Sequence, residues 1–269
     1  MTSLLVLGKN GQLGRALKRT SAVVYDAWGR ETCDFTDSEH LLTLLDTARP
    51  RVLINAAAYT NVDGAEGDAA TAFRVNAELP RVLAHWTGKH KAHLVHISTD
   101  YVFDGTKGTP YSEDDDPAPL NIYGESKLAG EDYVAASGAS YTILRTSCLY
   151  DEDGVNFRNK ILEQARRGTE ISIPVVTDII GSPTRADDFA RALWALTSSY
   201  TIARGLFHLA GAKALSRFEW AGEILAEEEG TSTLAPISYH HAEGTALRPR
   251  NTSLSSRLIA EKCGICLTE

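Results

Sequence analysis

Three residues have the types and spacing of an acid–base group that acts on a carbonyl. Tyr123 and Lys127 are four residues apart, so on a helix they share one face. A lysine ammonium beside a tyrosine favours the phenolate and lowers the phenol pKa toward the range of proton exchange. Thr99 ends an apolar segment, and its hydroxyl can hydrogen-bond and polarise a carbonyl oxygen. We therefore predict that Thr99, Tyr123 and Lys127 are catalytic.

A glycine pattern near the start of the chain indicates a dinucleotide site. Gly8, Gly11 and Gly14 are spaced three apart, directly after the apolar residues 4–7. Glycines let a backbone turn tightly and approach a pyrophosphate, whose charge then lies at a helix N-terminus. The spacing differs from the GxGxxG fingerprint, and glycines here could simply make a turn. The position at the start of an alternating chain favours the dinucleotide interpretation.

The first half of the chain alternates short apolar runs with longer amphipathic stretches. We predict strands at residues 4–7, 52–55, 94–98 and 141–144, and helices at residues 11–18, 38–47, 69–88 and 123–136. Asp37 and Pro50 are expected to bound the second of these helices. This alternation predicts an α/β fold, a Rossmann-type doubly wound parallel sheet with a smaller α/β substrate domain.

The regular alternation of apolar runs and amphipathic stretches ends after Arg145. Helices are predicted at residues 156–167, 186–197 and 218–229, the last capped by Ser216, and strands at residues 171–176 and 205–209. We predict a dinucleotide-binding domain at residues 1–147 and a substrate-binding domain at residues 148–269. The second domain is expected to be discontinuous, with residues 177–205, approximately, returning to the Rossmann sheet.

Composition narrows the class of protein. The 269 residues are 43% hydrophobic with a formal charge of −8, which is typical of a globular protein and argues against a nucleic-acid partner. No apolar run approaches the roughly 20 residues that span a bilayer, and residues 1–14 have no charged leader. We therefore expect no membrane partner.

Cysteine usage predicts a reducing, cytoplasmic compartment. The four cysteines are scattered, so a disulfide framework is not expected. Cys263 and Cys266 form a single CxxC pair, but a zinc site needs two further ligands and no second pair exists. We expect no metal.

The motifs in combination resemble one family. The chain resembles the dTDP-4-dehydrorhamnose reductase family of the extended short-chain dehydrogenase/reductase superfamily. The matching stretches run nearly from end to end: GKNGQLG (8–14), CDFTD (33–37), NAAAYTNVDGAE (55–66), STDYVFDG (98–105), PLNIYGESKLAGE (119–131), RTSCLY (145–150), GSPT (181–184), GLFHLAG (205–211) and RPRNTSL (248–254).

The resemblance implies NAD(P)H-dependent reduction of the C4 keto group of a nucleotide-linked 4-keto-6-deoxysugar. Tyr123 would give the proton and Lys127 would bind the nicotinamide ribose. The expected cofactor-binding residues are Gly8, Gly11, Gln12, Leu13, Gly14, Arg30, Asp34, Phe35, Ala56, Ala57, Ala58, Tyr123 and Lys127. Arg30 suits a 2′-phosphate while Glu31 and Asp34 oppose one, so either NADPH or NADH is expected, with NADPH preferred.

The resemblance also implies a substrate site with departures from the family. Its expected residues are Thr99, Asp100, Tyr123, Cys148, Arg248 and Arg250, the two arginines on the nucleotide diphosphate. Cys148 lies in a segment where family members commonly have a tryptophan that lines the sugar pocket; we expect extra space there, or Tyr150 or Phe157 filling it. Ala16 argues against the interface magnesium of some relatives, and the short segment after Cys266 leaves a homodimer open.

Two alternatives remain at this stage. A sugar-nucleotide epimerase or dehydratase could use the same scaffold, although Thr99 is followed by Asp100 and Tyr101 and lacks the glutamate typical of dehydratases. A non-catalytic dinucleotide-binding regulatory subunit is the other, which the complete set of Thr99, Tyr123 and Lys127 disfavours.

Overall fold

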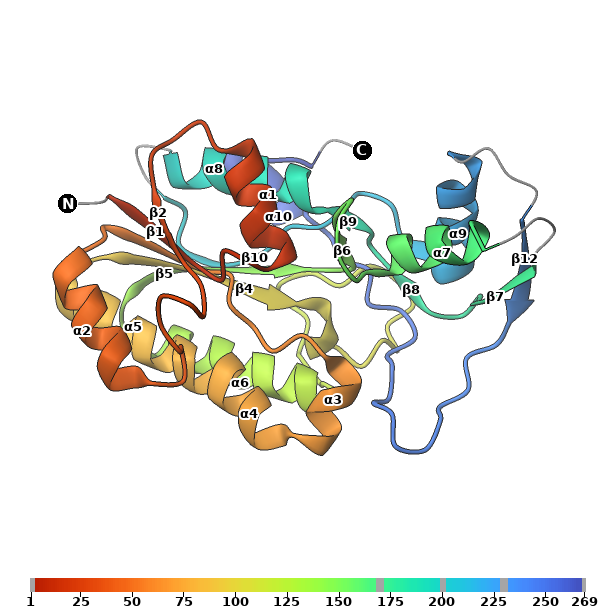
Figure 1. Cartoon of the computed structure of the whole chain (residues 1–269), viewed down its shortest axis with the longest axis horizontal. Coiled ribbons are helices and arrows are strands. Elements are labelled where there is room, and N and C mark those ends of the chain that lie inside the picture. The colour runs from red at the N-terminus through yellow and green to blue at the C-terminus, as the bar shows by residue number, and fades with distance from the viewer. Residues whose placement is uncertain (1–2, 168–171, 199–201, 228–231, 268–269) are drawn as a thin grey trace.

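The chain forms a broad sheet-based lobe and a smaller lobe beside it (Figure 1). The computed structural model describes residues 3–167, 172–198, 202–227 and 232–267. The larger lobe contains the central sheet with helices above and below it. The smaller lobe holds helices α7 (Phe157–Ala165) and α9 (Arg217–Ala226).

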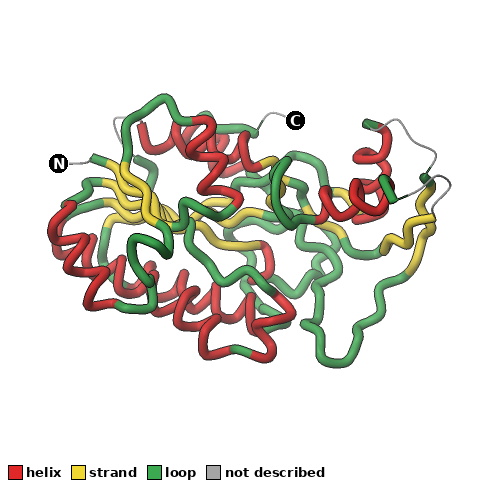
Figure 2. Tube along the Cα trace, in the orientation of Figure 1, coloured by secondary structure: helices red, strands yellow, loops and turns green. Residues whose placement is uncertain are grey.

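The central sheet has six parallel strands, as the alternation predicted. Their order is β10-β5-β4-β3-β1-β2, and neighbouring strands pair in parallel throughout. Their bounds are β1 Leu4–Leu7, β2 Asp26–Trp28, β3 Val52–Asn55, β4 His93–Thr99, β5 Ser140–Thr146 and β10 Gly205–His208. Figure 2 shows these strands as one twisted layer between helices. This order, reversing at β1, is that of a doubly wound fold.

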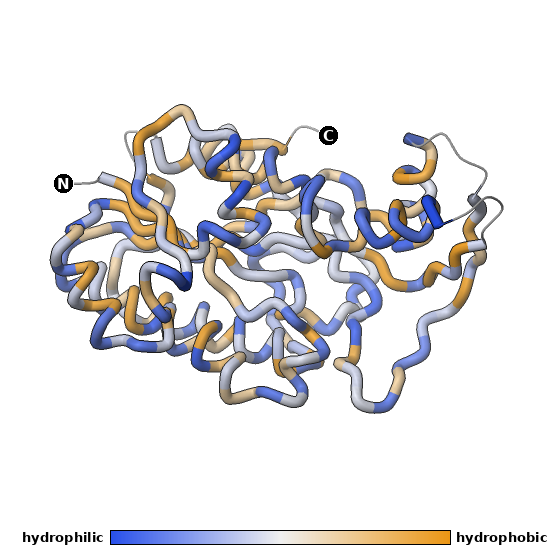
Figure 3. Tube along the Cα trace, in the orientation of Figure 1, coloured by the Kyte–Doolittle hydropathy of each residue, from blue (hydrophilic) through white to orange (hydrophobic). Residues whose placement is uncertain are grey.

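Alternate residues of each strand serve different cores. In β1, Leu4 and Val6 belong to one buried cluster, while Leu5 and Leu7 belong to another on the opposite face. Helices α1 (Gln12–Thr20), α8 (Ala186–Ser198) and α10 (Arg257–Cys263) cover the first face. Helices α2 (Ser38–Ala48), α5 (Leu79–His90) and α6 (Ile122–Ala136) cover the second. Figure 3 shows the resulting hydrophobic character of the central strands.

The single helix predicted over residues 69–88 is wrong in detail. The chain forms α3 (Val62–Gly67), then α4 (Ala69–Phe73), a π-helical turn (Arg74–Glu78) and α5. The π turn carries Asn76, which is fully buried. Its amide accepts from the Tyr59 backbone N–H at 2.8 Å and donates to the Tyr59 carbonyl and to Ser126 Oγ, each at 3.0 Å. These three bonds offset the loss of regular helix geometry.

Helix α6 approaches this π turn closely through Gly130. A Cβ there would overlap the backbone carbonyl oxygen of Asn76. Gly130→Ala is therefore expected to lower the free energy of unfolding by about 1–3 kcal/mol, the usual cost of overpacking. Urea unfolding would measure it. Gly88→Ala on α5 is the matched control: its Cβ would meet Ala139 Cβ at an ordinary 3.5 Å, so stability should stay equal or rise. Equal stability of both variants would contradict the prediction.

The smaller lobe has its own apolar cluster. Helices α7 and α9 pack on strands β7 (Ser172–Val176) and β12 (Thr233–Ile237), which pair in parallel. Ser216 caps α9 as predicted, in a capping box with Glu219, and the helix begins one residue earlier than predicted, at Arg217. Residue 171 and residues 228–229, which the predicted strand and helix included, lie outside the described residues.

Short strands join the lobes. They are β6 (Leu149–Tyr150), β8 (Ile180–Gly181), β9 (Thr184–Arg185) and β11 (Leu215–Ser216), with a 3₁₀ turn at Asp100–Val102. From the second half of the chain, α8 packs on α1 and β10 pairs with β5, while α10 packs beside β10. The division at residue 147 stays a prediction. None of the helices in the described ranges is long and apolar enough to cross a membrane.

Candidate functional site

A cavity of about 1100 Å³ opens at the carboxyl ends of the sheet strands. Its wall includes Gly8 after β1, Gly29 after β2, Ala56 after β3, Thr99 at the end of β4 and Thr146 at the end of β5. Ligands of open α/β sheets bind at this edge, near the point where the strand order reverses. The sheet therefore brings residues that are distant in sequence into one cavity.

The glycine loop has the shape that a pyrophosphate needs. Gly8 has φ +91°, and a Cβ there would lie 2.7 Å from backbone atoms of Ala56 and Ala57. A Cβ at Gly14 would overlap the carbonyl oxygen of Gly8, whereas a Cβ at Gly11 would meet it only at 3.4 Å. Gly11 is the N-cap of α1 and no side chain caps the helix. The first N–H groups of α1 are therefore free to bind an anion, and the loop fits a dinucleotide.

The cofactor residues predicted from sequence line one cavity, with the exception of Gly14. The cavity wall contains Gly8, Gly11, Gln12, Leu13, Arg30, Asp34, Phe35, Ala56, Ala57, Ala58, Tyr123 and Lys127. Gly14 is behind the wall, where it lets α1 pack against the loop. Its effect on the cofactor is therefore indirect.

Two arginines give the cavity positive charge at the end that follows β2. Arg30 and Arg74 both line it and both lower the pKa of Asp34, after hydrogen bonds from Thr36, the largest cause. Glu31, expected to oppose a 2′-phosphate, instead forms an ion pair with Lys9 at 2.5 Å. Sequence reasoning missed Arg74, because only the packing of the π turn brings it into the cavity wall near Asp34.

The three predicted catalytic residues share the cavity. Thr99 and Lys127 are buried and Tyr123 is half-buried, and all three line the wall. Burial raises the pKa of the Tyr123 phenol, and its hydrogen bond with Thr99 acts in the opposite direction. The phenol is therefore protonated at neutral pH and can donate to a developing alkoxide.

Lys127 does not act on Tyr123 as predicted. Its Nζ donates to the carbonyl oxygen of Ile97 at 2.6 Å, and Lys127 is not among the groups that shift the pKa of Tyr123. Burial lowers the pKa of Lys127 to about 8, while Glu131 opposes this shift. The lysine is therefore a buried cation that titrates near physiological pH.

Asp100 is more deeply buried than a sugar-binding residue needs to be. Its carboxylate accepts hydrogen bonds from Thr99 at 3.1 Å, Ser147 at 2.7 Å and Thr252 at 2.5 Å. Burial raises its pKa, and the three hydroxyls lower it. Asp100 contributes to the cavity wall and also holds the Thr99 hydroxyl, and its contact with the sugar stays a prediction.

Two hydroxyls of the same region have no hydrogen-bond partner among the residues that the structure describes. Ser98 Oγ and Thr146 Oγ1 are buried, line the cavity and make no hydrogen bond to any described residue. A buried unsatisfied hydroxyl costs about 1–3 kcal/mol. Ligand groups that hydrogen-bond to these hydroxyls would recover this free energy, which supports a polar ligand at the ends of β4 and β5.

Cys148 does line the cavity, and both predicted neighbours belong with it to the apolar cluster of the smaller lobe. Tyr150 and Phe157 pack against Trp220. Arg217 lies against the Cys148 thiol and also lines the cavity. Sequence reasoning missed Arg217, whose only signal was its place at the start of a predicted helix.

The two arginines predicted to bind the diphosphate lie elsewhere. Arg248 binds both carboxylate oxygens of Asp63, at 2.8 and 2.9 Å, and Arg250 pairs with Asp178. Neither lines the cavity. Each guanidinium already has an anionic partner, and Arg248 also lies close enough to Tyr101 of the wall to oppose the rise that burial causes in the pKa of its phenol. The role of both arginines on the diphosphate stays a prediction.

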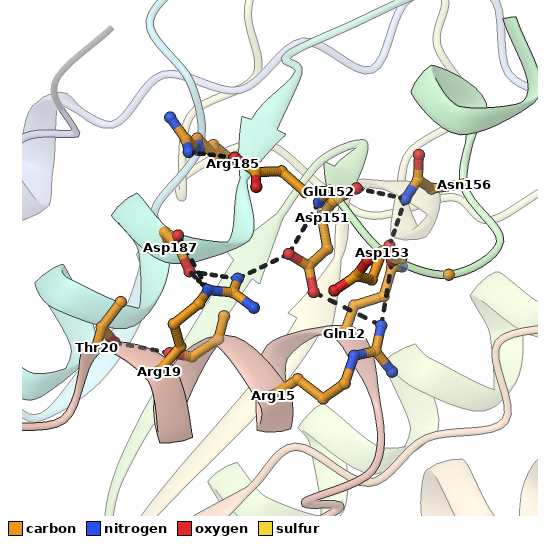
Figure 4. Close-up of polar contacts among 12 residues, drawn as sticks. Gln12, Arg15, Arg19, Thr20, Asp151, Glu152, Asp153, Asn156, Arg185 and Asp187 are labelled. Carbon is orange, nitrogen blue, oxygen red and sulfur yellow. Dashed lines mark hydrogen bonds and ion pairs between the residues drawn. The ribbon is translucent and has the colours of Figure 1, made fainter. Parts of the chain in front are cut away.

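The loop of residues 151–156 in the smaller lobe contacts helix α1 (Figure 4). Asp151 is 2% exposed and pairs with Arg19 at 2.7 Å, while Arg15 lies 3.6 Å from its other oxygen. Arg19 also binds Asp187 of α8 at 2.5 Å, and Asn156 donates to Gln12 at 3.1 Å. These contacts hold the loop of residues 151–156 over α1. Gly154 and Val155 of this loop line the cavity.

The family comparison agrees with this geometry. The family described as RmlD substrate binding domain matches residues 1–269. The chain belongs to this family. Its RmlD-family relatives include a dTDP-4-dehydrorhamnose reductase of Sinorhizobium fredii, 40% identical over 98% of this chain and 92% of the relative. Another, from Burkholderia thailandensis, is 37% identical over 99% and 94%.

Solved structures of the family share the whole fold. A dTDP-4-dehydrorhamnose reductase from Bacillus anthracis, solved in complex with NADP, has a TM-score of 0.91. It is 32% identical, and the match covers 100% of this chain and 96% of that chain. The predicted family and the predicted Rossmann-type fold are therefore confirmed.

Metal binding has no support from the described side chains. No group of three or more His, Cys, Asp or Glu in those ranges could hold a metal ion. Cys263 and Cys266 are free thiols. The expectation of no metal in this RmlD-family protein stays a prediction.

The lowered pKa of Lys127 predicts a pH dependence of cofactor binding. The ammonium exists below about pH 8 and is lost as pH rises through that value, so NADPH affinity should fall there. Fluorescence titration of NADPH on either side of this pH would measure it. The Tyr123→Phe variant should keep the same fall, because the raised pKa of Tyr123 leaves its phenol neutral in this range. A fall that disappears in that variant would assign it to the phenol.

Proposed function

We propose that this protein uses NADPH to reduce the C4 keto group of a dTDP-linked 4-keto-6-deoxysugar. The observation that carries the proposal is the meeting of Thr99, Tyr123 and Lys127 with the glycine loop in one cavity. The relatives named dTDP-4-dehydrorhamnose reductase support the reaction, and the NADP complex of one neighbour supports the cofactor.

The reaction needs a proton for the carbonyl oxygen. When bound, NADPH supplies the hydride that reaches C4 of the sugar. The Thr99 hydroxyl hydrogen-bonds the carbonyl oxygen and holds it near the phenol. Tyr123, kept protonated by burial, then gives its proton to the oxygen as negative charge develops there. The product is the C4 alcohol.

Lys127 would position the cofactor. One of its three N–H donors binds the Ile97 carbonyl, which fixes the ammonium in the cavity wall. The remaining donors suit the hydroxyls of the nicotinamide ribose. At the opposite end, Arg30 and Arg74 suit a 2′-phosphate, because guanidinium groups bind phosphate oxygens in a fork. This pair, with Glu31 held by Lys9, favours NADPH over NADH.

A single assay tests the proposal. Freshly prepared dTDP-4-keto-6-deoxysugar is incubated with the protein and NADPH or NADH, and the product is analysed. We expect stoichiometric oxidation of NADPH and a product reduced at C4. A sugar isomer formed without net NADPH oxidation would indicate an epimerase. No turnover together with tight binding to another enzyme would indicate a regulatory subunit, and either result would overturn the proposal.

Two further features stay predictions. A cytoplasmic location rests on cysteine usage, and a homodimer rests on the resemblance to the family. Light scattering of the purified protein would decide its oligomeric state.

A further inference from the structure

The cavity wall contains one cation that the proposed reaction does not use. Arg217 is the first residue of α9, and its side chain is half-buried. Its guanidinium lies over the rings of Phe157 and Trp220, with its carbon 4.9 and 5.3 Å from their centroids. The Cys148 thiol lies on another side. Arg217 is therefore held in place by aromatic and sulfur contacts rather than by an acid.

The lack of an acidic partner sets Arg217 apart. Among the described residues, no carboxylate lies within ion-pair distance of it, and Glu219 of the same helix is occupied by the capping box with Ser216. Four arginines near the lobe interface form ion pairs: Arg19 with Asp187, Arg145 with Glu131, Arg248 with Asp63 and Arg250 with Asp178. Arg30 and Arg74 of the cavity wall lie close enough to Asp34 to lower the pKa of its carboxyl group. Asp100, the nearest buried acid in the wall, already accepts three hydroxyl hydrogens. A cation taken partly out of water without a counterion is unfavourable, so this position suits an anionic ligand.

The location of Arg217 separates it from the cofactor. The pyrophosphate loop is on β1 and α1, and the Arg30–Arg74 pair is at the opposite end of the cavity from the smaller lobe. Arg217 comes from the smaller lobe and acts electrostatically on Tyr101. The Tyr101 ring stands edge-on to the Tyr123 ring, with centroids 5.8 Å apart. The guanidinium thus lies in the part of the cavity wall that Cys148 and Tyr101 form, on the side of the smaller lobe.

We propose that Arg217 is the substrate-anion residue of this enzyme, binding the diphosphate of the nucleotide sugar. This inference rests on the proposed function for the identity of the substrate. The diphosphate is the anion that a dTDP-linked 4-keto-6-deoxysugar carries. A guanidinium fork binds phosphate oxygens with two parallel hydrogen bonds.

Ligand binding without turnover tests the proposal. The NADP-loaded protein is titrated by calorimetry with thymidine, dTMP and dTDP, and with UDP-glucose and UDP-glucuronate as a pair that differs in a carboxylate. Arg217→Gln removes the charge, and Arg217→Lys keeps the charge without the fork. Arg191→Gln is the matched control, since Arg191 is 59% exposed and pairs with Asp188 on the surface of α8.

The expected result is a loss of anion affinity that follows the charge. Arg217→Gln should weaken one class of anionic ligand by about 10- to 100-fold, the range of a charged hydrogen bond, with Arg217→Lys between it and wild type. Thymidine affinity and NADP affinity should stay unchanged, and Arg191→Gln should match wild type throughout. A loss confined to dTDP identifies the β-phosphate, and a loss shared with dTMP identifies the α-phosphate. A loss confined to the preference for UDP-glucuronate over UDP-glucose would assign Arg217 to a sugar carboxylate and would overturn the diphosphate assignment.

Other results would overturn the assignment. Unchanged affinities of Arg217→Gln for all five ligands would do so, as would a loss of dTDP affinity in Arg248→Gln or Arg250→Gln instead. If Arg217→Gln does not fold, as judged by NADP binding, the Arg217→Lys variant decides instead. Equal affinities of this variant and wild type for the anionic ligands would also overturn the assignment. Failure of the proposed function is distinguishable: an absence of keto-sugar reduction in wild type refutes that function and leaves the anion result standing.

Discussion

Replacing Tyr123 by phenylalanine is expected to lower kcat by about 10²- to 10⁴-fold, the usual worth of a general acid. The change removes only the hydroxyl, and burial that raises the pKa of this phenol keeps it protonated for donation. The ring remains to stand against Tyr101, so the cavity should keep its shape. NADPH affinity should therefore stay close to that of wild type. Steady-state kinetics with the keto sugar and fluorescence titration of NADPH measure the two effects.

The same helix offers a control for this substitution. Tyr133 is also on α6, is 41% exposed and lies beneath Arg81 at the surface. Tyr133→Phe should leave kcat within the error of the assay. A Tyr123→Phe enzyme with more than half of wild-type turnover would show that another group donates the proton.

Gly11→Val is expected to raise the Kd for NADPH on the order of 100-fold while leaving the fold intact. Gly11 has φ −73° and ψ 171°, a conformation that valine adopts readily. A Cβ there would meet only the Gly8 carbonyl oxygen, at 3.4 Å. The branched side chain would instead occupy the cavity at the N-terminus of α1, where a pyrophosphate would bind. Fluorescence titration gives the Kd and thermal unfolding gives the stability.

Gly14→Val is the informative comparison. Its Cβ would overlap the backbone of Gly8 and Lys9, so this variant should lose stability as well as cofactor binding. Equal NADPH affinity of Gly11→Val and wild type would place the cofactor away from the glycine loop. Equal stability of Gly14→Val and wild type would contradict the close packing of α1 on the loop.

Local sequence determined much of the fold because its signals act within a few residues. Asp37 caps α2 through the backbone N–H of His40, and Ser216 caps α9, both as predicted. The apolar runs became parallel strands because their side chains alternate between two buried faces. The pair proposed to be catalytic was predictable for the same reason, since a spacing of four on α6 places Tyr123 and Lys127 on one face.

Only the tertiary structure decided the features that depend on distant partners. The π turn forms because Asn76 finds Tyr59 and Ser126, 17 and 50 residues away in the chain. Lys127 binds the Ile97 carbonyl instead of governing the phenol, since the end of β4 lies beneath α6. Arg248 and Arg250 looked suited to a diphosphate by residue type, yet Asp63 and Asp178 hold them away from the cavity.

The charge of the cavity illustrates the limit of sequence reasoning. The sequence does not predict which arginine forms an ion pair with an acidic residue. Such pairs form between segments that only the packing of the fold brings together. Arg74 and Arg217 line the cavity from a π turn and from the start of α9, and neither carries a local signal of binding. The sequence by itself determined the family and the sheet, and it predicted a group of three residues, Thr99, Tyr123 and Lys127, that lie in one cavity. The packing of the two lobes decided which cations face the ligands, because that choice depends on contacts across more than a hundred residues of chain.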